Sequence, residues 1–99
     1  MDNRDKLKLA TKELTEEFVT ALANAGKELG LGDEADMIAA QTVLGSAELI
    51  RQSGIHPVEL ADRVCSPGGT TIEGLLSLKK DGFEEIITSS AEKIIEEQK

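Results

Sequence analysis

Apolar residues recur at helical intervals along the first third of the chain. From about Asn3 to Leu29 the sequence places them three, four or seven positions apart, at Leu7, Leu14, Phe18, Ala21, Leu22, Ala25 and Leu29. Such spacing puts the side chains on one stripe of an amphipathic helix. Gly30 and Gly32 then interrupt the pattern, as glycines do at the end of a helix. The pattern predicts a long first helix.

A second long helix is predicted from about Glu34 to Gln52, with Asp33 as its N-cap. It is apolar around much of its circumference, at Met37, Ile38, Ala39, Ala40, Val43, Leu44, Ala47 and Leu49. A helix that is apolar on several faces is expected to be central and buried. Gly45 and Ser46 in its middle would let another backbone approach closely, although the glycine costs roughly 1 kcal/mol of helix propensity.

Three further helical segments follow. Pro57 suits the first position of a short third helix. Thr70 and Glu73 have the spacing of a capping box at the start of the fourth helix, and Asp81-Gly82 separates the fourth from the fifth. The apolar positions are Val58, Leu60, Ala61 and Val64, then Ile72, Leu75, Leu76 and Leu78, then Phe83, Ile86, Ile87, Ala91, Ile94 and Ile95. With no persistent strand pattern and no linker, the sequence predicts one all-α domain of five helices spanning residues 1–99.

Composition makes the predicted core thin. The 99 residues include no Trp, no Tyr and two Phe, so the core must be built mainly from aliphatic side chains. A chain of this size buries roughly 65% of the surface of its unfolded form. We therefore expect a second chain to supply part of the stability.

The charge excludes two classes of partner. A formal net charge of −8 disfavours nucleic acid and anionic membranes, which both attract clustered Lys and Arg. No apolar run is long enough to span a membrane, and the polar start is unlike a signal peptide. Cys65 is the single cysteine, which fits a reduced, cytoplasmic setting.

The loop Ser66-Pro67-Gly68-Gly69-Thr70-Thr71 is the segment with most chemical promise. Backbone N–H groups at a helix N-terminus are unpaired and favour an anion such as a carboxylate or phosphate. Hydroxyls of Ser66, Thr70 and Thr71 could add hydrogen bonds. A tight turn with a capped helix fits the same residues, and most such helix starts bind nothing. No Lys follows the glycines at P-loop spacing.

Other chemistry-bearing residues are interpreted as structural. His56 precedes a proline at a helix start, where a capping or surface role is expected, and no second His exists to share a metal. Cys65 has no base adjacent in sequence and is expected to be a quiet thiol. Glu16 and Glu17 are neighbours on a helix, so their side chains point in different directions and face solvent.

From about Phe18 onward the chain resembles pyrroline-5-carboxylate reductase, specifically its C-terminal dimerisation domain. The most specific shared motif is the run from Ser66 to Thr71. The other matching stretches are 21–26 (Ala-Leu-Ala-Asn-Ala-Gly), 29–31 (Leu-Gly-Leu), 39–47 (Ala-Ala-Gln-Thr-Val-Leu-Gly-Ser-Ala), His56-Pro57, Val64-Cys65 before the loop, Ile72 after it, and 81–83 (Asp-Gly-Phe).

The resemblance implies an all-helical fold whose long helices intertwine with those of a second copy in an obligate homodimer. It implies that Ser66, Gly68, Gly69 and Thr70 contact a proline-like carboxylate. Thr71 matches the threonine whose hydroxyl reaches the ring nitrogen and assists its protonation. The related enzyme reduces the C=N bond of the pyrroline with hydride from NADPH or NADH, in proline biosynthesis.

Two departures from the family pattern change the expected function. No G-x-G-x-x-G motif follows a strand, so we expect no cofactor in this chain and no catalysis by it alone. Where family members open the domain with Ser-Gly-Ser-Gly-Pro-Ala, residues 8–13 are Lys-Leu-Ala-Thr-Lys-Glu, and charged Glu16 and Glu17 follow. Such changes would make an isolated domain soluble, which suggests engineering or a naturally truncated relative.

Three hypotheses follow. The first is a structural, self-associating helical module without catalytic activity. The second is a residual binding module that still captures proline or a related carboxylate at Gly68 to Thr71. The third is an enzyme fragment that works with a separate NAD(P)H-binding domain, against which the charges of Glu16 and Glu17 count.

Overall fold

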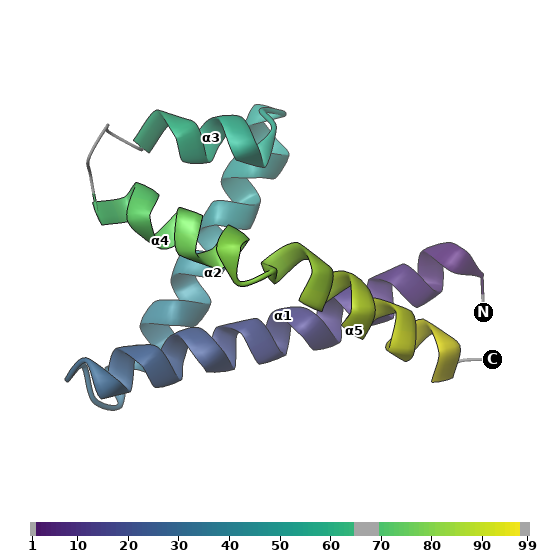
Figure 1. Ribbon diagram of the computed structural model, residues 1–99, viewed down its shortest axis with the longest axis horizontal. Coiled ribbons are helices and arrows are strands. Elements are labelled where there is room, and N and C mark those ends of the chain that lie inside the picture. Colours follow the sequence, from purple (N-terminus) through teal and green to yellow (C-terminus); the bar gives the residue numbers. More distant parts are fainter. Residues whose placement is uncertain (1, 65–69, 98–99) are drawn as a thin grey trace.

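Five helices make up the described part of the chain (Figure 1). The computed structural model describes residues 2–64 and 70–97. The helices are α1 (Asn3–Glu28), α2 (Glu34–Ser53), α3 (Pro57–Val64), α4 (Thr70–Lys80) and α5 (Phe83–Glu97), and these described ranges contain no strand. The predicted all-α fold, with long first and second helices, is confirmed.

The two ends of α1 show how local chemistry sets its length. Asp2 is the N-cap, and its Oδ1 accepts a hydrogen bond from the Asp5 N–H at 2.9 Å. This bond satisfies one of the unpaired donors of the first turn. At the other end, Gly30 has a φ of 95°. That conformation favours glycine, and the predicted glycine stop is confirmed.

The predicted cap of α2 is only partly right. Asp33 occupies the N-cap position, but its side chain makes no capping hydrogen bond. Its backbone is already helical, with φ −68° and ψ −18°. A capping side chain needs an extended backbone to reach the first turn. Instead, the Ala35 N–H donates to the Gly32 carbonyl at 3.2 Å. At the far end, Gly54 ends α2 in the left-handed conformation.

The helices form two arms joined at a corner (Figure 1). The first arm is α1, and α2 leaves the C-terminal end of α1 as the second arm; α3 and α4 then lead back toward α1. The last helix, α5, lies along the N-terminal half of α1, so both chain ends lie at the same end of the molecule. The rings of Phe18 in α1 and Phe83 in α5 meet with centroids 6.0 Å apart.

Alanines form the core. The buried residues among those described are Ala10, Ala23, Ala35 and Ala39, and no large side chain in the described ranges is fully buried. Ala23, Ala35 and Ala39 cluster where α1 crosses α2. The two helices approach so closely there that a Cβ added to Gly26 would lie 3.1 Å from the Ala35 Cβ. Small residues therefore allow α1 and α2 to pack closely at the corner where they meet.

The expectation of a buried second helix is not met within a single chain. Leu44, for example, is 67% exposed, so it does not belong to an intrachain core. Exposed large apolar residues occur on every described helix: Leu7, Phe18 and Leu22 on α1; Met37, Ile38, Leu44 and Leu49 on α2; Val58 on α3; Leu76 and Leu78 on α4; and Ile86 on α5. Within one chain, the packing of the helices leaves these apolar side chains exposed.

Candidate functional site

The predicted carboxylate-binding loop falls largely outside the described residues. Ser66, Gly68 and Gly69 lie outside them, as does Cys65. Thr70 and Thr71 are the first residues of α4, so the fourth helix starts where the sequence predicted. The capping box stays a prediction, because the side chains of Thr70 and Thr71 are not among those described. The binding role of Ser66, Gly68, Gly69, Thr70 and Thr71 therefore stays a prediction.

His56 has the structural role expected of it. Its Nδ1 accepts a hydrogen bond from the Val58 N–H at 3.1 Å, at the start of α3. Pro57 is the first residue of that helix, where its missing N–H costs nothing. The imidazole thus helps to cap α3. Among the described residues no group of His, Cys, Asp and Glu could hold a metal ion.

The carboxylates of α1 are solvent-facing, as predicted. Glu16 pairs with Lys12 at 3.0 Å, with both side chains more than half exposed, and Glu17 is exposed. The hydrogen bond from Lys12 to Glu16, together with the charges of Glu16 and Glu13, raises the pKa of the Lys12 ammonium above its ordinary value. An exposed pair of this kind adds little to stability.

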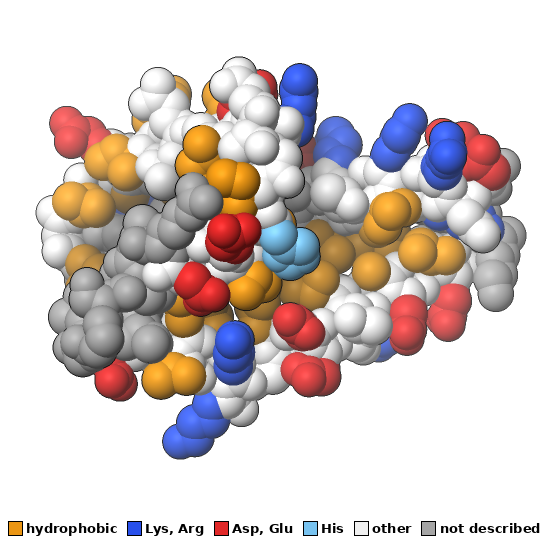
Figure 2. Space-filling view, turned by 90° about the horizontal axis from the view of Figure 1, so that it is seen from above, with side chains coloured by type: hydrophobic (Ala, Val, Ile, Leu, Met, Phe, Trp, Pro, Cys, Tyr) orange, Lys and Arg blue, Asp and Glu red, His pale blue; other side chains and the backbone are white. Residues whose placement is uncertain are grey.

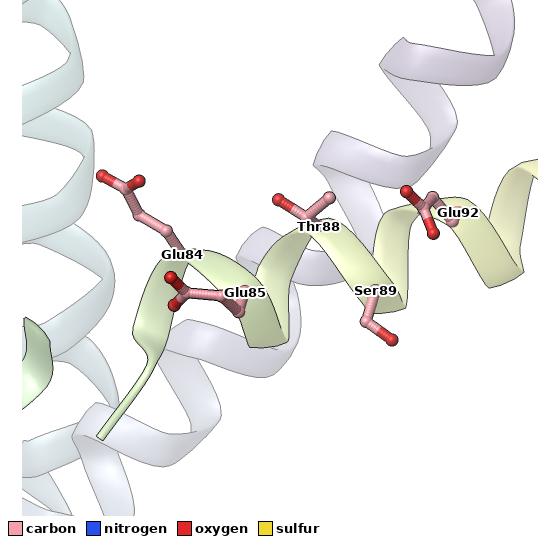
Figure 3. Close-up of a pocket in the computed structure, with 5 residues that line it drawn as sticks. All are labelled: Glu84, Glu85, Thr88, Ser89 and Glu92. Atoms are coloured by element: carbon pink, nitrogen blue, oxygen red, sulfur yellow. The ribbon is translucent and has the colours of Figure 1, made fainter. Parts of the chain in front are cut away.

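A shallow depression of about 340 Å³ runs along the outer side of α5 (Figure 3). It is lined by Glu84, Glu85, Thr88, Ser89 and Glu92. In Figure 3 the Glu84, Thr88 and Glu92 side chains rise on one side of the helix, and Ser89 points to the other. Three carboxylates repel an anion, so this surface does not suit a carboxylate ligand. It is best described as a solvated helix face.

A groove between the two arms has the opposite character. Its volume is about 370 Å³, and its walls are Phe18 and Leu22 from α1 and Thr42, Val43, Ser46, Ala47 and Ile50 from α2. No charged side chain lines it. Phe18 and Leu22 are 38% and 41% exposed, so the groove is open to solvent in the single chain. A groove of this composition suits apolar side chains rather than a charged metabolite.

The groove is part of a larger excess of exposed surface. The chain exposes 7947 Å² of surface. A compact monomer of the same mass is expected to expose only about 5500 Å². The radius of gyration is 15.3 Å. A compact domain of this length would have a radius of about 13 Å. Figure 2 shows apolar side chains spread along the visible face among the charged ones. This excess includes exposed apolar surface, which in other proteins marks a site of association.

Sequence reasoning identified the apolar residues of this surface but not their position. The spacing of Phe18 and Leu22 placed them on the stripe of α1, and the mainly aliphatic composition of the chain suggested a partner chain. The groove itself depends on the angle between α1 and α2, and the local spacing of apolar residues does not predict that angle. Within the described residues, no helix is long and apolar enough to cross a membrane.

Comparison with known proteins points to one family. The sequence model described as pyrroline-5-carboxylate reductase dimerisation matches residues 14–99. Pyrroline-5-carboxylate reductase of Treponema pallidum is 47% identical over 72 residues, covering 72% of this chain and 27% of that protein. The enzyme of Escherichia coli strain K12 is 41% identical over 80 residues, covering 80% of this chain and 30% of that protein.

A solved structure agrees in fold. The crystal structure of Plasmodium falciparum pyrroline carboxylate reductase with NADP bound superposes with a TM-score of 0.84 at 29% identity, over 98% of this chain and 39% of that chain. The chain thus spans well under half the length of these relatives. The match covers α2 to α5 and the larger part of α1. The chain belongs to the pyrroline-5-carboxylate reductase dimerisation family.

Proposed function

We propose that residues 1–99 act as a homodimerisation module, in which two copies cover each other's apolar faces. The surface excess supports this most directly. The chain exposes about 2400 Å² more than a compact monomer of its mass would. Obligate homodimer interfaces bury about 2000–5000 Å² in total, or half of that per chain, so a dimer would remove an excess of this size.

The distribution of the apolar residues supports the same proposal. In the described chain α1 packs on α2 and on α5, and α4 touches α5, so α2 is covered mainly by α1. Met37, Leu44 and Leu49 on α2 are each more than half exposed. Burying apolar surface contributes roughly 25 cal/mol per Å². A second copy is the partner that the family description names.

Native mass spectrometry after mild chemical cross-linking tests the proposal. We expect a species of twice 10.6 kDa as the main product at micromolar concentration. A main product at 10.6 kDa, from a chain that circular dichroism shows to be helical, would reject it.

We further propose that this segment contributes assembly rather than hydride transfer. The 99 residues contain no G-x-G-x-x-G motif, which supports the absence of a nicotinamide cofactor site within the segment. Its single cysteine supports a reduced, cytoplasmic setting. NADPH absorbance in the presence of pyrroline-5-carboxylate is expected to stay constant, and a protein-dependent decrease would contradict the proposal.

Carboxylate capture by the loop is a second candidate function, supported by family membership and by the Ser66–Thr71 sequence. Proline titration followed by calorimetry tests it. The expected result is saturable heat that Thr71→Ala reduces while thermal stability stays nearly unchanged. If proline gave no heat with the dimer, the loop would not be a binding site in this segment.

A further inference from the structure

We propose that α5 is a strap, fastened to the N-terminal half of α1 where Ala10 faces Ala91, and that it opens as one unit while the corner between α1 and α2 stays folded. The inference concerns contacts within one chain, so it does not depend on the proposed homodimer. It divides the described part of the molecule into two units that unfold separately.

The burial of Ala10 shows where the strap is fastened. Of the buried residues among those described, Ala10 is the least exposed, at 1%. α1 packs on α2 and on α5, and α2 leaves α1 at its C-terminal end, so α5 is the helix that covers Ala10 (Figure 1). The match to the family's sequence model begins at residue 14. The contact at Ala10 therefore lies ahead of the residues that the family model accounts for.

The pairing with Ala91 follows from the antiparallel course of the two helices. The rings of Phe18 and Phe83 meet with centroids 6.0 Å apart, and from there α5 runs toward the N-terminus of α1 (Figure 1). Ala10 stands eight residues before Phe18. Ala91 stands eight residues after Phe83, which is about 12 Å along each helix. The two alanines therefore reach the same level.

The contact between the helices is apolar along this length. Leu14 and Ile87 stand midway between the two rings and the two alanines, and both are half-buried, as is Ala91. Facing alanines let two helix backbones approach closely, because their side chains end at one methyl group. Such a contact has no room for a charged side chain at Ala10.

The strap and the corner have separate cores. Ala23, Ala35 and Ala39 form the buried cluster at the corner, and Ala10 is not part of it. Ala10 stands thirteen residues before Ala23, which is about 20 Å along α1. Proteins open in cooperative units that follow such separate sets of buried contacts. The α5 contact can therefore open while the corner remains packed.

Gly82 supplies the point about which the strap turns. It separates α4 from α5 and has a φ of 80°, which glycine adopts readily. A Cβ added there would lie 3.4 Å from the end of the Glu85 side chain, with no backbone atom as close. A few residues at the end of a helix are enough to absorb the backbone rotation of a hinge.

Ala10→Asp tests the fastening. The substitution places an unpaired carboxylate in an apolar contact, which costs free energy only while the strap is closed. We expect the amide hydrogens of α5 to exchange at least about tenfold faster than in the parent, and those of α2 to stay within a few-fold of it. Hydrogen exchange measured by mass spectrometry, on the full chain at one fixed protein concentration, compares the two helices.

Thr11→Asp is the matched control. Thr11 is exposed, and it adds the same charge one residue further along α1. A helix turns about 100° per residue, so the new carboxylate points away from the contact at Ala10. We expect exchange in α5 to stay within a few-fold of the parent rate.

The pattern of exchange decides the inference. Faster exchange in α5 alone after Ala10→Asp supports the strap. Equal acceleration in α5 and α2 would mean that the molecule opens as a whole, and an unchanged rate in α5 would mean that Ala10 does not fasten it. An equal effect of Thr11→Asp would mean that added charge is the cause. Each of these three results rejects the strap.

A disulfide tests the same contact if Ala10→Asp fails to fold. In a Cys65→Ser background, Ala10→Cys with Ala91→Cys brings two thiols together at the facing positions, and oxidised glutathione converts them to a disulfide. We expect the disulfide to form within one chain, at 10.6 kDa on a non-reducing denaturing gel, and to slow exchange in α5 at least about tenfold without slowing it in α2.

Ala10→Cys with Ser89→Cys is the control for this disulfide. Ser89 is exposed and lies two residues before Ala91, about 200° around α5, so its thiol should stay reduced. A disulfide that joined two chains, or one that formed equally well at Ser89, would overturn the inference, and so would a failure of the Ala91→Cys pair to react.

Discussion

At Gly26 the two arms of the molecule approach each other closely. A Cβ there would sit 3.1 Å from the Ala35 Cβ, and Ala35 is itself 3% exposed. The alanine methyl is fixed to its backbone, so relief requires a movement of one helix relative to the other. The Lys27 Nζ and the Asp36 carboxylate, 3.2 Å apart, tie the arms together beside this point.

Gly26→Ala is therefore expected to destabilise the protein by about 1 kcal/mol, because overpacking costs about 1–3 kcal/mol and outweighs the gain in helix propensity of about 1 kcal/mol. Gly74→Ala in α4 is the control, since a Cβ there would contact nothing within 4 Å, and it should be neutral or stabilising. Thermal unfolding at one fixed protein concentration compares the two. Equal shifts in Tm would show that a methyl group at position 26 does not strain the contact between α1 and α2.

A substitution of Lys12 tests how much the exposed charges of α1 contribute to the stability of the fold. Glu16 raises the pKa of its ammonium, so any stabilisation is present below the ordinary pKa and is lost as pH rises through the raised value. Because the pair is exposed and screened, Lys12→Met should leave Tm unchanged from pH 7 to 9. A clear drop in Tm would mean that the pair is structurally important.

Among the helical elements, the ends of α2 show what the sequence could and could not predict. The predicted end of the second helix near Gln52 was correct, since α2 ends at Ser53 and Gly54 follows it with a φ of 68°, which glycine adopts easily. Asp33 as an N-cap was right in position but wrong in hydrogen bonding, because the turn left its backbone helical. Element type follows from local spacing, whereas cap geometry depends on how the chain enters the helix.

Gly54→Ala is expected to destabilise α2 by about 1 kcal/mol, a cost that comes from the left-handed backbone. The space around Gly54 is open, so no steric contact adds to that cost. Gly54→Asn should cost less, since asparagine tolerates this conformation better. Urea unfolding monitored by circular dichroism measures both. If the two substitutions were equally destabilising, backbone conformation would not be the cause.

For the whole molecule, the arrangement of the arms decides which apolar residues are covered. The sequence predicted five helices from the spacing of apolar residues, and a second chain from the thin, mainly aliphatic core. It could not predict that Leu44 would be exposed while Ala35 and Ala39 are buried, since this depends on the crossing of α1 and α2. The loop Ser66–Thr71 was identified from its residues, and its binding role stays a prediction.

Leu44→Asp tests whether a second copy covers α2. Leu44 is 67% exposed in one chain, so the variant is expected to keep its helix content. In a dimer the carboxylate would be buried and unpaired, and this would weaken association at least about a hundredfold. Asn24→Asp, which adds the same charge at an exposed position of α1, is the control and should leave association within a few-fold. Sedimentation velocity distinguishes the two, and equal behaviour would contradict a covered Leu44.

We propose that this chain covers its apolar surface with a second copy. Light scattering behind a sizing column, across a dilution series of the parent chain, tests this dimer. We predict a mass of twice 10.6 kDa that persists on dilution until the dissociation constant is reached. A well-folded species of 10.6 kDa at every concentration would rule out the dimer.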